Sequence, residues 1–86
     1  MAIRIRGIVQ GVFFRKTTQQ KAVQLGITGT VKNKDDGSVY IEACGTPEAL
    51  KALVEWCHEG PPRAEVESVE TKDMEFKEFK DFSIKR

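Results

Sequence analysis

The sequence has no long hydrophobic run and no excess of one charge, and these two absences exclude several classes of protein. No apolar stretch among the 86 residues approaches the roughly 18 residues that a membrane span needs, and no secretory pattern opens the chain. The 14 Lys and Arg residues nearly balance the 13 Asp and Glu residues, for a formal net charge of +1. This balance gives no electrostatic reason to expect nucleic acid or an anionic membrane as a partner. We therefore expect a single soluble, cytoplasmic domain over residues 1–86.

Residues that bind metals or form disulfides are also scarce. The two cysteines, Cys44 and Cys57, fall in different predicted elements and lack the spacing of metal ligands. Free buried thiols are the favoured interpretation, and a disulfide or a reactive cysteine are the alternatives. The one histidine, His58, falls at the C-terminal end of a predicted helix, where the negative end of the helix dipole favours it. This role is preferred to that of a phosphohistidine or a ligand.

Hydrophobic periodicity and turn signals predict seven short elements. Ile3 and Ile5 alternate with Arg4 and Arg6, which is the period of a half-buried strand. Later in the chain, Thr46 and Pro47 have the residue types of a helix cap and first helical position. In chain order we expect a strand over residues 2–8, a helix from residue 14 or 15 to 25, strands over 28–33 and 38–44, a helix beginning at Pro47, a strand over 64–70 and a short edge strand over 82–84.

This order is β-α-β-β-α-β with an additional C-terminal strand, and it predicts the α+β class. The compact arrangement for such an order is a ferredoxin-like α/β sandwich, in which two helices pack on one face of an antiparallel sheet. Because this fold serves many functions, the function has to be argued from a site.

The segment GIVQGVFFR, residues 7–15, joins the first strand to the first helix and forms a candidate anion site. Unpaired N–H groups at a helix start point outward together and carry the positive end of the helix dipole. Gly7 and Gly11 allow a turn tight enough to aim several amides at one point, and the Arg15 guanidinium matches two phosphate oxygens. A phosphate site and a tight turn with a solvated Arg15 both fit these residues. A nucleotide P-loop does not, because Arg15 stands where a glycine should precede Lys16.

The same segment resembles the acylphosphatase signature G-x-V-Q-G-V-x-F-R and matches it at every fixed position. A second block, GTVKNKDDGSV, resembles the family's G-W-V-x-N-x-x-D-G-x-V, although Thr30 replaces the usual aromatic residue. The spacing between the blocks and the segments ACGTPEAL and GPP are similar to small bacterial-type members. The resemblance therefore covers essentially the whole chain. Thr30 is expected on the sheet face opposite to Val31 and Asn33, away from any phosphate.

The resemblance implies hydrolysis of the carboxyl–phosphate bond of acyl phosphates, giving a carboxylate and inorganic phosphate. Arg15 would hold the phosphoryl group electrostatically, and Asn33 would position the attacking water. The phosphoryl oxygens would be bound by loop amides around Gln10, Gly11, Val12, Phe13 and Phe14. The substrate would be a small-molecule acyl phosphate, the bound anion would be phosphate or sulfate, and no metal or cofactor is implied. A monomeric chain is expected.

These residue types suit that reaction. The leaving group is a weakly basic carboxylate, so catalysis needs charge neutralisation and an in-line water more than it needs an acid. Asp35 and Asp36 follow Asn33 closely and are candidate bases, but turn formation is their favoured role. We therefore hypothesise that the phosphoryl oxygens of the substrate take the proton of the water. A pH–rate profile with a titrating group that mutation assigns to Asp35 or Asp36 would contradict this hypothesis. Phe14 is expected in the core, and the place of Phe13 stays open.

Two other functions remain as alternatives. One is a module of the same fold that holds phosphate or an acyl phosphate without rapid turnover, and slow turnover with measurable phosphate affinity would favour it. The other is a single-stranded RNA binder, which needs aromatic platforms on the middle strands and a basic sheet face. The predicted third strand has only Tyr40 and the first has no aromatic residue, so RNA binding is disfavoured.

Overall fold

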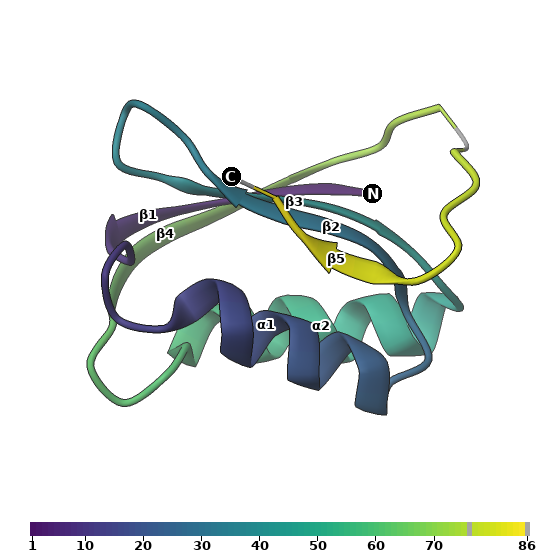
Figure 1. The fold of residues 1–86 in the computed structure, drawn as a ribbon, viewed down its shortest axis with the longest axis horizontal. Helices are drawn as coiled ribbons and strands as arrows, with labels where there is room; N and C mark the ends of the chain where they lie inside the picture. The colour runs from purple at the N-terminus through teal and green to yellow at the C-terminus, as the bar shows by residue number, and fades with distance from the viewer. Residues whose placement is uncertain (76, 86) are drawn as a thin grey trace.

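Two helices cover one face of a five-stranded sheet in the computed structural model, which describes residues 1–75 and 77–85 (Figure 1). In chain order the elements are β1 (Ala2–Ile8), α1 (Phe14–Gln24), β2 (Thr28–Asn33), β3 (Val39–Cys44), α2 (Pro47–Glu59), β4 (Glu65–Lys72) and β5 (Phe82–Ile84). The predicted ferredoxin-like α/β sandwich is confirmed, and element ends differ from the expected ones by one or two residues. Among the described residues, no helix has both the length and the apolar character needed to cross a bilayer.

The strand order across the sheet is β4-β1-β3-β2-β5. The first four of these strands pair antiparallel, as expected, but β5 pairs parallel with β2, so the sheet is mixed rather than wholly antiparallel. The reason is where β4 ends. Lys72 pairs with Ala2, at the end of the sheet where β2 also begins. Residues 73–75 and 77–81 lie at that end of the sheet, so β5 enters the far edge in the same direction as β2 (Figure 1).

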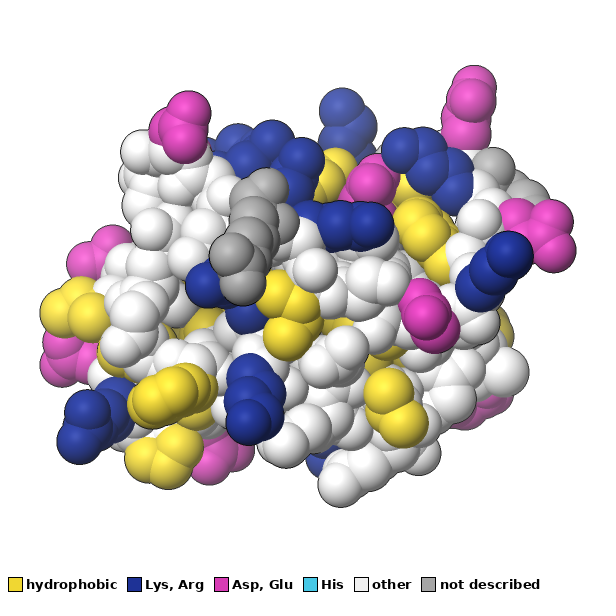
Figure 2. Space-filling model, viewed as in Figure 1, with side chains coloured by type: hydrophobic (Ala, Val, Ile, Leu, Met, Phe, Trp, Pro, Cys, Tyr) yellow, Lys and Arg dark blue, Asp and Glu magenta, His cyan; other side chains and the backbone are white. Residues whose placement is uncertain are grey.

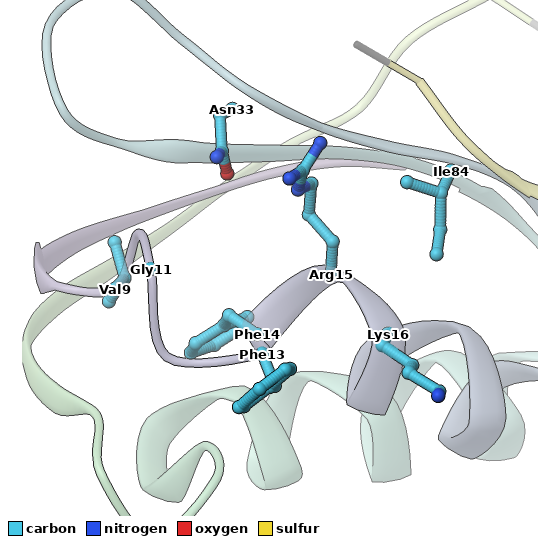
Figure 3. Close-up of a pocket in the computed structure, with 8 residues that line it drawn as sticks. All are labelled: Val9, Gly11, Phe13, Phe14, Arg15, Lys16, Asn33 and Ile84. Carbon is cyan, nitrogen blue, oxygen red and sulfur yellow. The ribbon is translucent and has the colours of Figure 1, made fainter.

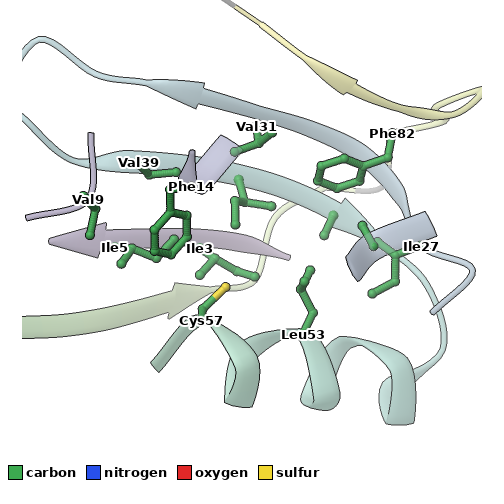
Figure 4. Packing of buried hydrophobic residues seen from close by; sticks show 13 residues of the cluster. Ile3, Ile5, Val9, Phe14, Ile27, Val31, Val39, Leu53, Cys57 and Phe82 are labelled. Atoms are coloured by element: carbon green, nitrogen blue, oxygen red, sulfur yellow. The ribbon is translucent and has the colours of Figure 1, made fainter. Parts of the chain in front are cut away.

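The hydrophobic core lies between the helices and the inner face of the sheet. Ile3 and Ile5 are fully buried, while Arg4 and Arg6 alternate with them on the open face, as the period predicts. Leu53 of α2 packs into the same cluster (Figure 4). On the face shown in Figure 2, hydrophobic side chains form small separate groups, and basic side chains gather along the sheet side.

Both cysteines are free, and they differ in environment. Cys57 is buried in the core, and this burial raises the pKa of its thiol to about 12. Cys44 is only half-buried, and its Sγ donates a hydrogen bond to the carbonyl oxygen of Lys77 at 3.1 Å. The prediction of free thiols is therefore confirmed, but Cys44 is not the buried thiol that was expected. It lies on β3 at a position that faces away from the helices.

The second helix begins as its sequence predicts. The Thr46 side chain accepts a hydrogen bond from the Ala49 N–H at 3.1 Å, Pro47 opens the helix and Glu48 lies in the first turn. The acidic side chain and the cap both complement the positive end of the α2 dipole. His58 lies exposed in the last turn, which is the place expected for it.

Gly29 allows β2 and β3 to approach closely. Its φ is +149°, and a Cβ there would lie 1.9 Å from the carbonyl oxygen of Glu42 on β3. Its N–H donates to the carbonyl oxygen of Asp81 at 2.8 Å, just before β5. Glycine is therefore required where β2 contacts both of its neighbours, β3 and β5.

Candidate active site

The loop between β1 and α1 forms one wall of a cavity of about 330 Å³ (Figure 3). The cavity lies at the end of the sheet where β2 finishes and α1 begins. It is lined by Val9, Gly11, Phe13, Phe14, Arg15, Lys16, Asn33 and Ile84. Two segments that lie well apart in the sequence, the signature loop and the end of β2, are therefore brought together. Gln10 and Val12, two other predicted site residues, do not line the cavity.

Two residues of the loop, Gly11 and Phe13, have a backbone with positive φ. Gly11 has a φ of 75°, and Phe13 has a φ of 64° with a ψ of 22°, which is the left-handed region. Among the described residues, Phe13 is the only non-glycine residue with a positive φ. Backbone that alternates between right- and left-handed conformations forms concave groups of N–H donors that bind anions.

The backbone donors in the first turn of α1 have no hydrogen-bond partner among the described residues. The first helical hydrogen bond runs from the Thr17 N–H to the Phe13 carbonyl oxygen at 3.0 Å, so the N–H groups before Thr17 have no carbonyl one turn back. No side chain of the described residues caps this helix, and its first turn contains Arg15 and Lys16 instead of an acidic residue. The α2 start, with a cap and an acidic residue, is the opposite arrangement. The α1 start therefore concentrates positive potential at the cavity.

Arg15 and Asn33 reach into the cavity from opposite layers (Figure 3). Arg15 projects from α1 towards the sheet, and its Nη1 donates to the carbonyl oxygen of Lys85 at 3.3 Å, just after β5. Asn33 projects from the last position of β2 towards the loop. Its Oδ1 is buried and receives no hydrogen bond from the described part of the chain. An unpaired buried acceptor costs about 1–3 kcal/mol, so a donor in the cavity would stabilise the site.

The Gln10 side chain ties the loop to the turn after Asn33. Its Nε2 donates to the carbonyl oxygens of Lys34 at 2.8 Å and Ser38 at 2.9 Å. The side-chain amide of Gln10 therefore fixes the position of the loop relative to the end of β2. Sequence reasoning missed this role because the acceptors are main-chain carbonyls 24 and 28 residues away, which no residue type marks.

The turn between β2 and β3 is stabilised by Asp36. Its Oδ1 accepts hydrogen bonds from the Ser38 hydroxyl and from the Ser38 N–H, the latter at 2.9 Å, and its Oδ2 lies 3.3 Å from Nη1 of Arg6. These bonds to Ser38, and then the charge of Arg6, lower the pKa of the Asp36 carboxyl to about 2. The carboxylate is thus engaged in the turn, as expected, and is too weakly basic to deprotonate a water.

Three cavity residues were not assigned from the sequence. Val9 is buried at the base of the loop, and Lys16 follows Arg15, with an amine that points away from Asn33 (Figure 3). Ile84 comes from β5, and only the pairing of β5 with β2 brings it here. The alternation of Phe82 and Ile84 with polar residues predicted the strand, but no local sequence pattern shows which strand it pairs with. Among the described residues, no three His, Cys, Asp or Glu side chains cluster as a metal site would require.

Comparison with solved structures shows the same fold in acylphosphatases. A structure of an acylphosphatase from Coxiella burnetii matches with a TM-score of 0.94 and 39% identity, covering 98% of this chain and 88% of that one. The acylphosphatase from Bacillus subtilis matches with a TM-score of 0.93 and 37% identity, covering 99% and 96%. Full-length HypF, in a phosphate- and nucleotide-bound form, matches at a TM-score of 0.88 and 32% identity, but only over 11% of its length.

Sequence comparison points the same way. This chain is 53% identical over 79 residues to an acylphosphatase of Marinobacter nauticus, covering 91% of this chain and 86% of that protein. It is 51% identical over 80 residues to an acylphosphatase of Halorhodospira halophila, covering 93% and 87%. The family model for acylphosphatase matches residues 1–84. Because that match spans nearly the whole chain, the chain belongs to the acylphosphatase family, which is a family of hydrolases.

Proposed function

We propose that this member of the acylphosphatase family hydrolyses the carboxyl–phosphate bond of acyl phosphates, with the phosphoryl group held at the β1–α1 loop. The loop amides of residues 10–14 and the Arg15 guanidinium bind the phosphoryl oxygens. Asn33 positions the water that attacks phosphorus. The bound anion in the absence of substrate is phosphate or sulfate.

The observation that carries this proposal is the contrast between the two helix starts. The α2 start is neutralised by Thr46 and Glu48, whereas the α1 start has neither cap nor acid and adds Arg15 and Lys16. Cations at the positive end of a helix dipole destabilise a helix unless an anion binds there. A phosphoryl group supplies both the charge and the acceptor oxygens that this helix start lacks.

In the proposed reaction, water attacks phosphorus while the bond between phosphorus and the carboxylate oxygen breaks. The electron pair of that bond leaves with the carboxylate, and the proton of the water moves to a phosphoryl oxygen. Arg15 and the amides neutralise the charge on the equatorial oxygens, and the Asn33 Oδ1 accepts a hydrogen bond from the water. A protein base is not needed in this scheme, which agrees with the low pKa of Asp36.

We also propose a cytoplasmic, monomeric enzyme. The two free thiols, Cys44 and Cys57, suit a reducing compartment. Light scattering on the purified chain tests the monomer, and a molecular mass of twice 9.7 kDa or more would contradict it.

The test is hydrolysis of benzoyl phosphate in the presence of a metal chelator. We expect rapid turnover by the wild-type chain, competitive inhibition by inorganic phosphate, and a loss of about 100-fold or more in Arg15→Ala. Lys51→Ala, which removes an exposed cation from α2, is the matched control and should keep full activity. If the folded wild-type chain binds phosphate but does not turn over, the proposal fails and the non-catalytic phosphate-binding module replaces it.

A further inference from the structure

We propose that Phe13 binds the acyl group of the substrate and makes this enzyme prefer bulky apolar acyl phosphates, aromatic ones above all, to small ones. This inference rests on the proposed function and names the substrate class of that site. It is carried by the exposure of Phe13, by its backbone conformation and by its place at the cavity.

The two phenylalanines of the signature loop have opposite environments. The Phe14 side chain is 1% exposed, and its ring lies 5.5 Å from that of Trp56, centroid to centroid, within the core. The Phe13 side chain is 72% exposed and does not pack against the core cluster. Phe13 therefore contributes almost nothing to the hydrophobic stabilisation of the fold.

The backbone conformation at Phe13 makes its exposure more informative. A φ of 64° is favourable for glycine and tolerable for asparagine, and it costs about 1–2 kcal/mol for a residue with a larger side chain. An aromatic residue here thus lowers stability and gains no buried contact in return. Strained residues of this kind are concentrated at ligand-binding sites, which makes Phe13 a candidate for contact with a ligand.

The cavity gives the Phe13 ring a ligand to contact. Its polar lining includes Arg15 and Asn33, and its apolar lining includes Phe13, where the loop enters α1, and Ile84 on the sheet side, which is 37% exposed (Figure 3). A phosphoryl group held by Arg15 leaves the acyl group, joined to phosphorus through one oxygen, to extend over the Phe13 ring. Burial of an aromatic acyl group there removes apolar surface of both partners from water.

The proposed direction of attack places the acyl group on the Phe13 side. In-line displacement puts the attacking water and the leaving carboxylate on opposite sides of phosphorus. Asn33, which positions the water, lies on the sheet side of Arg15, and Phe13 lies on the opposite side, where the loop enters α1 (Figure 3). The leaving carboxylate and its acyl group therefore face Phe13, away from Asn33.

The experiment compares benzoyl phosphate with acetyl phosphate, by kcat and KM, in wild type and in Phe13→Asn. Asparagine tolerates the left-handed conformation, so this variant keeps the loop while it removes the ring. We expect the KM for benzoyl phosphate to rise roughly tenfold with little change in kcat, because a non-reacting contact is lost. The substitution keeps the main-chain N–H at position 13, so the KM for acetyl phosphate and inhibition by inorganic phosphate should change several-fold less than the KM for benzoyl phosphate.

Two further variants separate a contact with the acyl group from a general effect on the fold. Phe13→Tyr keeps the ring and should retain the preference for benzoyl phosphate. Val23→Asn removes an apolar side chain of α1 that is 63% exposed but does not line the cavity, and it should leave the preference unchanged. Phe13→Gly, which also suits a positive φ, replaces Phe13→Asn if circular dichroism shows that the asparagine variant is unfolded.

The outcomes separate this inference from the proposed function. A wild-type chain that hydrolyses neither substrate would overturn both. An active wild type whose preference is unchanged in Phe13→Asn, or an equal loss for both substrates, would overturn the role of Phe13 alone. A selective rise in the KM for benzoyl phosphate, with the preference kept in Phe13→Tyr, supports it.

Discussion

The Arg15 guanidinium donates a hydrogen bond to the main-chain carbonyl oxygen of Lys85, 70 residues later in the chain, at 3.3 Å. One N–H donor of the side chain is thereby used for orientation, and the remaining donors stay available to the cavity. The residue after the last strand thus fixes the direction of an arginine at the first helix. A guanidinium can make this contact and bind a phosphoryl group together, because its donors point in several directions.

Replacing Arg15 with lysine should lower activity almost as much as removing the charge. In Arg15→Lys the positive charge remains, but the planar fork and its contact with the Lys85 carbonyl are lost. We expect kcat/KM for benzoyl phosphate to fall about 100-fold. If the lysine variant stays within about threefold of wild type, a point charge is sufficient and the fork is not needed.

Replacing Asn33 should affect kcat rather than KM. An amide that positions water acts in the transition state, so Asn33→Ala should lower kcat about 100-fold and leave the KM for benzoyl phosphate nearly unchanged. Asn33→Asp puts a negative charge opposite the phosphoryl group and should raise the KM as well. A higher KM with normal kcat in Asn33→Ala would show that Asn33 binds substrate instead of water.

Replacing Gln10 should loosen the loop without changing substrate preference. In Gln10→Glu a carboxylate faces the carbonyl oxygens of Lys34 and Ser38, to which it cannot donate. We expect a loss of about 1–3 kcal/mol in the free energy of unfolding in urea. The kcat/KM for benzoyl and acetyl phosphate should fall by equal factors. A change in one substrate alone would mean that the Gln10 side chain contacts the acyl group.

The parts of this molecule that sequence predicted well are those that depend on near neighbours. The cap at Thr46 depends on contacts within one helical turn, and the alternation of Ile3 with Arg4 depends on the two faces of a single strand. Sequence alone did not predict that β5 runs parallel to β2, because its direction depends on where β4 ends and on the sheet edge at β2 being available for pairing. The same limit applies at the site, where Ile84 and the Lys85 carbonyl arrive from a segment far along the chain.

Within the loop itself, the signature named candidate residues but did not predict what each side chain does. Arg15 and Asn33 reach the cavity as expected, and their roles remain predictions. Val12 packs against the core, and Gln10 bonds to the β2–β3 turn, so any contact of these two with phosphate is through their backbone. Phe13 is exposed and has a left-handed backbone, which sequence reasoning did not predict because a phenylalanine disfavours that conformation.

Replacing Gly29 with alanine should be strongly destabilising. The new Cβ would lie 1.9 Å from the Glu42 carbonyl oxygen, so β2 and β3 would have to separate. We expect a loss of about 3 kcal/mol or more and a fall in Tm of more than about 10 °C. Gly37→Ala is the matched control, because Gly37 has a φ of 90° but a Cβ added to it would meet no atom within 4 Å. It should cost about 1 kcal/mol, and equal losses in both variants would contradict the steric argument.

Replacing Asp36 should destabilise the turn in a pH-dependent way. The folded pKa of about 2 lies below the ordinary value of 3.8, so the stabilisation is complete above about pH 4 and is lost as the pH falls towards 2. Asp36→Asn should therefore be less stable than wild type at neutral pH, and the difference should shrink through this acid range in urea titrations. Asp35→Asn, at the exposed neighbouring position, is the control. A difference that is constant from neutral pH to pH 2 would contradict the role of the Asp36 charge.

The strand order β4-β1-β3-β2-β5 also sets when the proposed site can be completed during synthesis of the chain. Only β2 and β3 are neighbours both in the sheet and in the sequence, so only that hairpin can close early on an emerging chain. While residues 82–85 are still enclosed by the ribosome, β5 cannot pair with β2 and Lys85 cannot reach Arg15. The arginine at the start of α1 thus gains its support from a residue made 70 positions later, and the site is completed only once that residue has emerged.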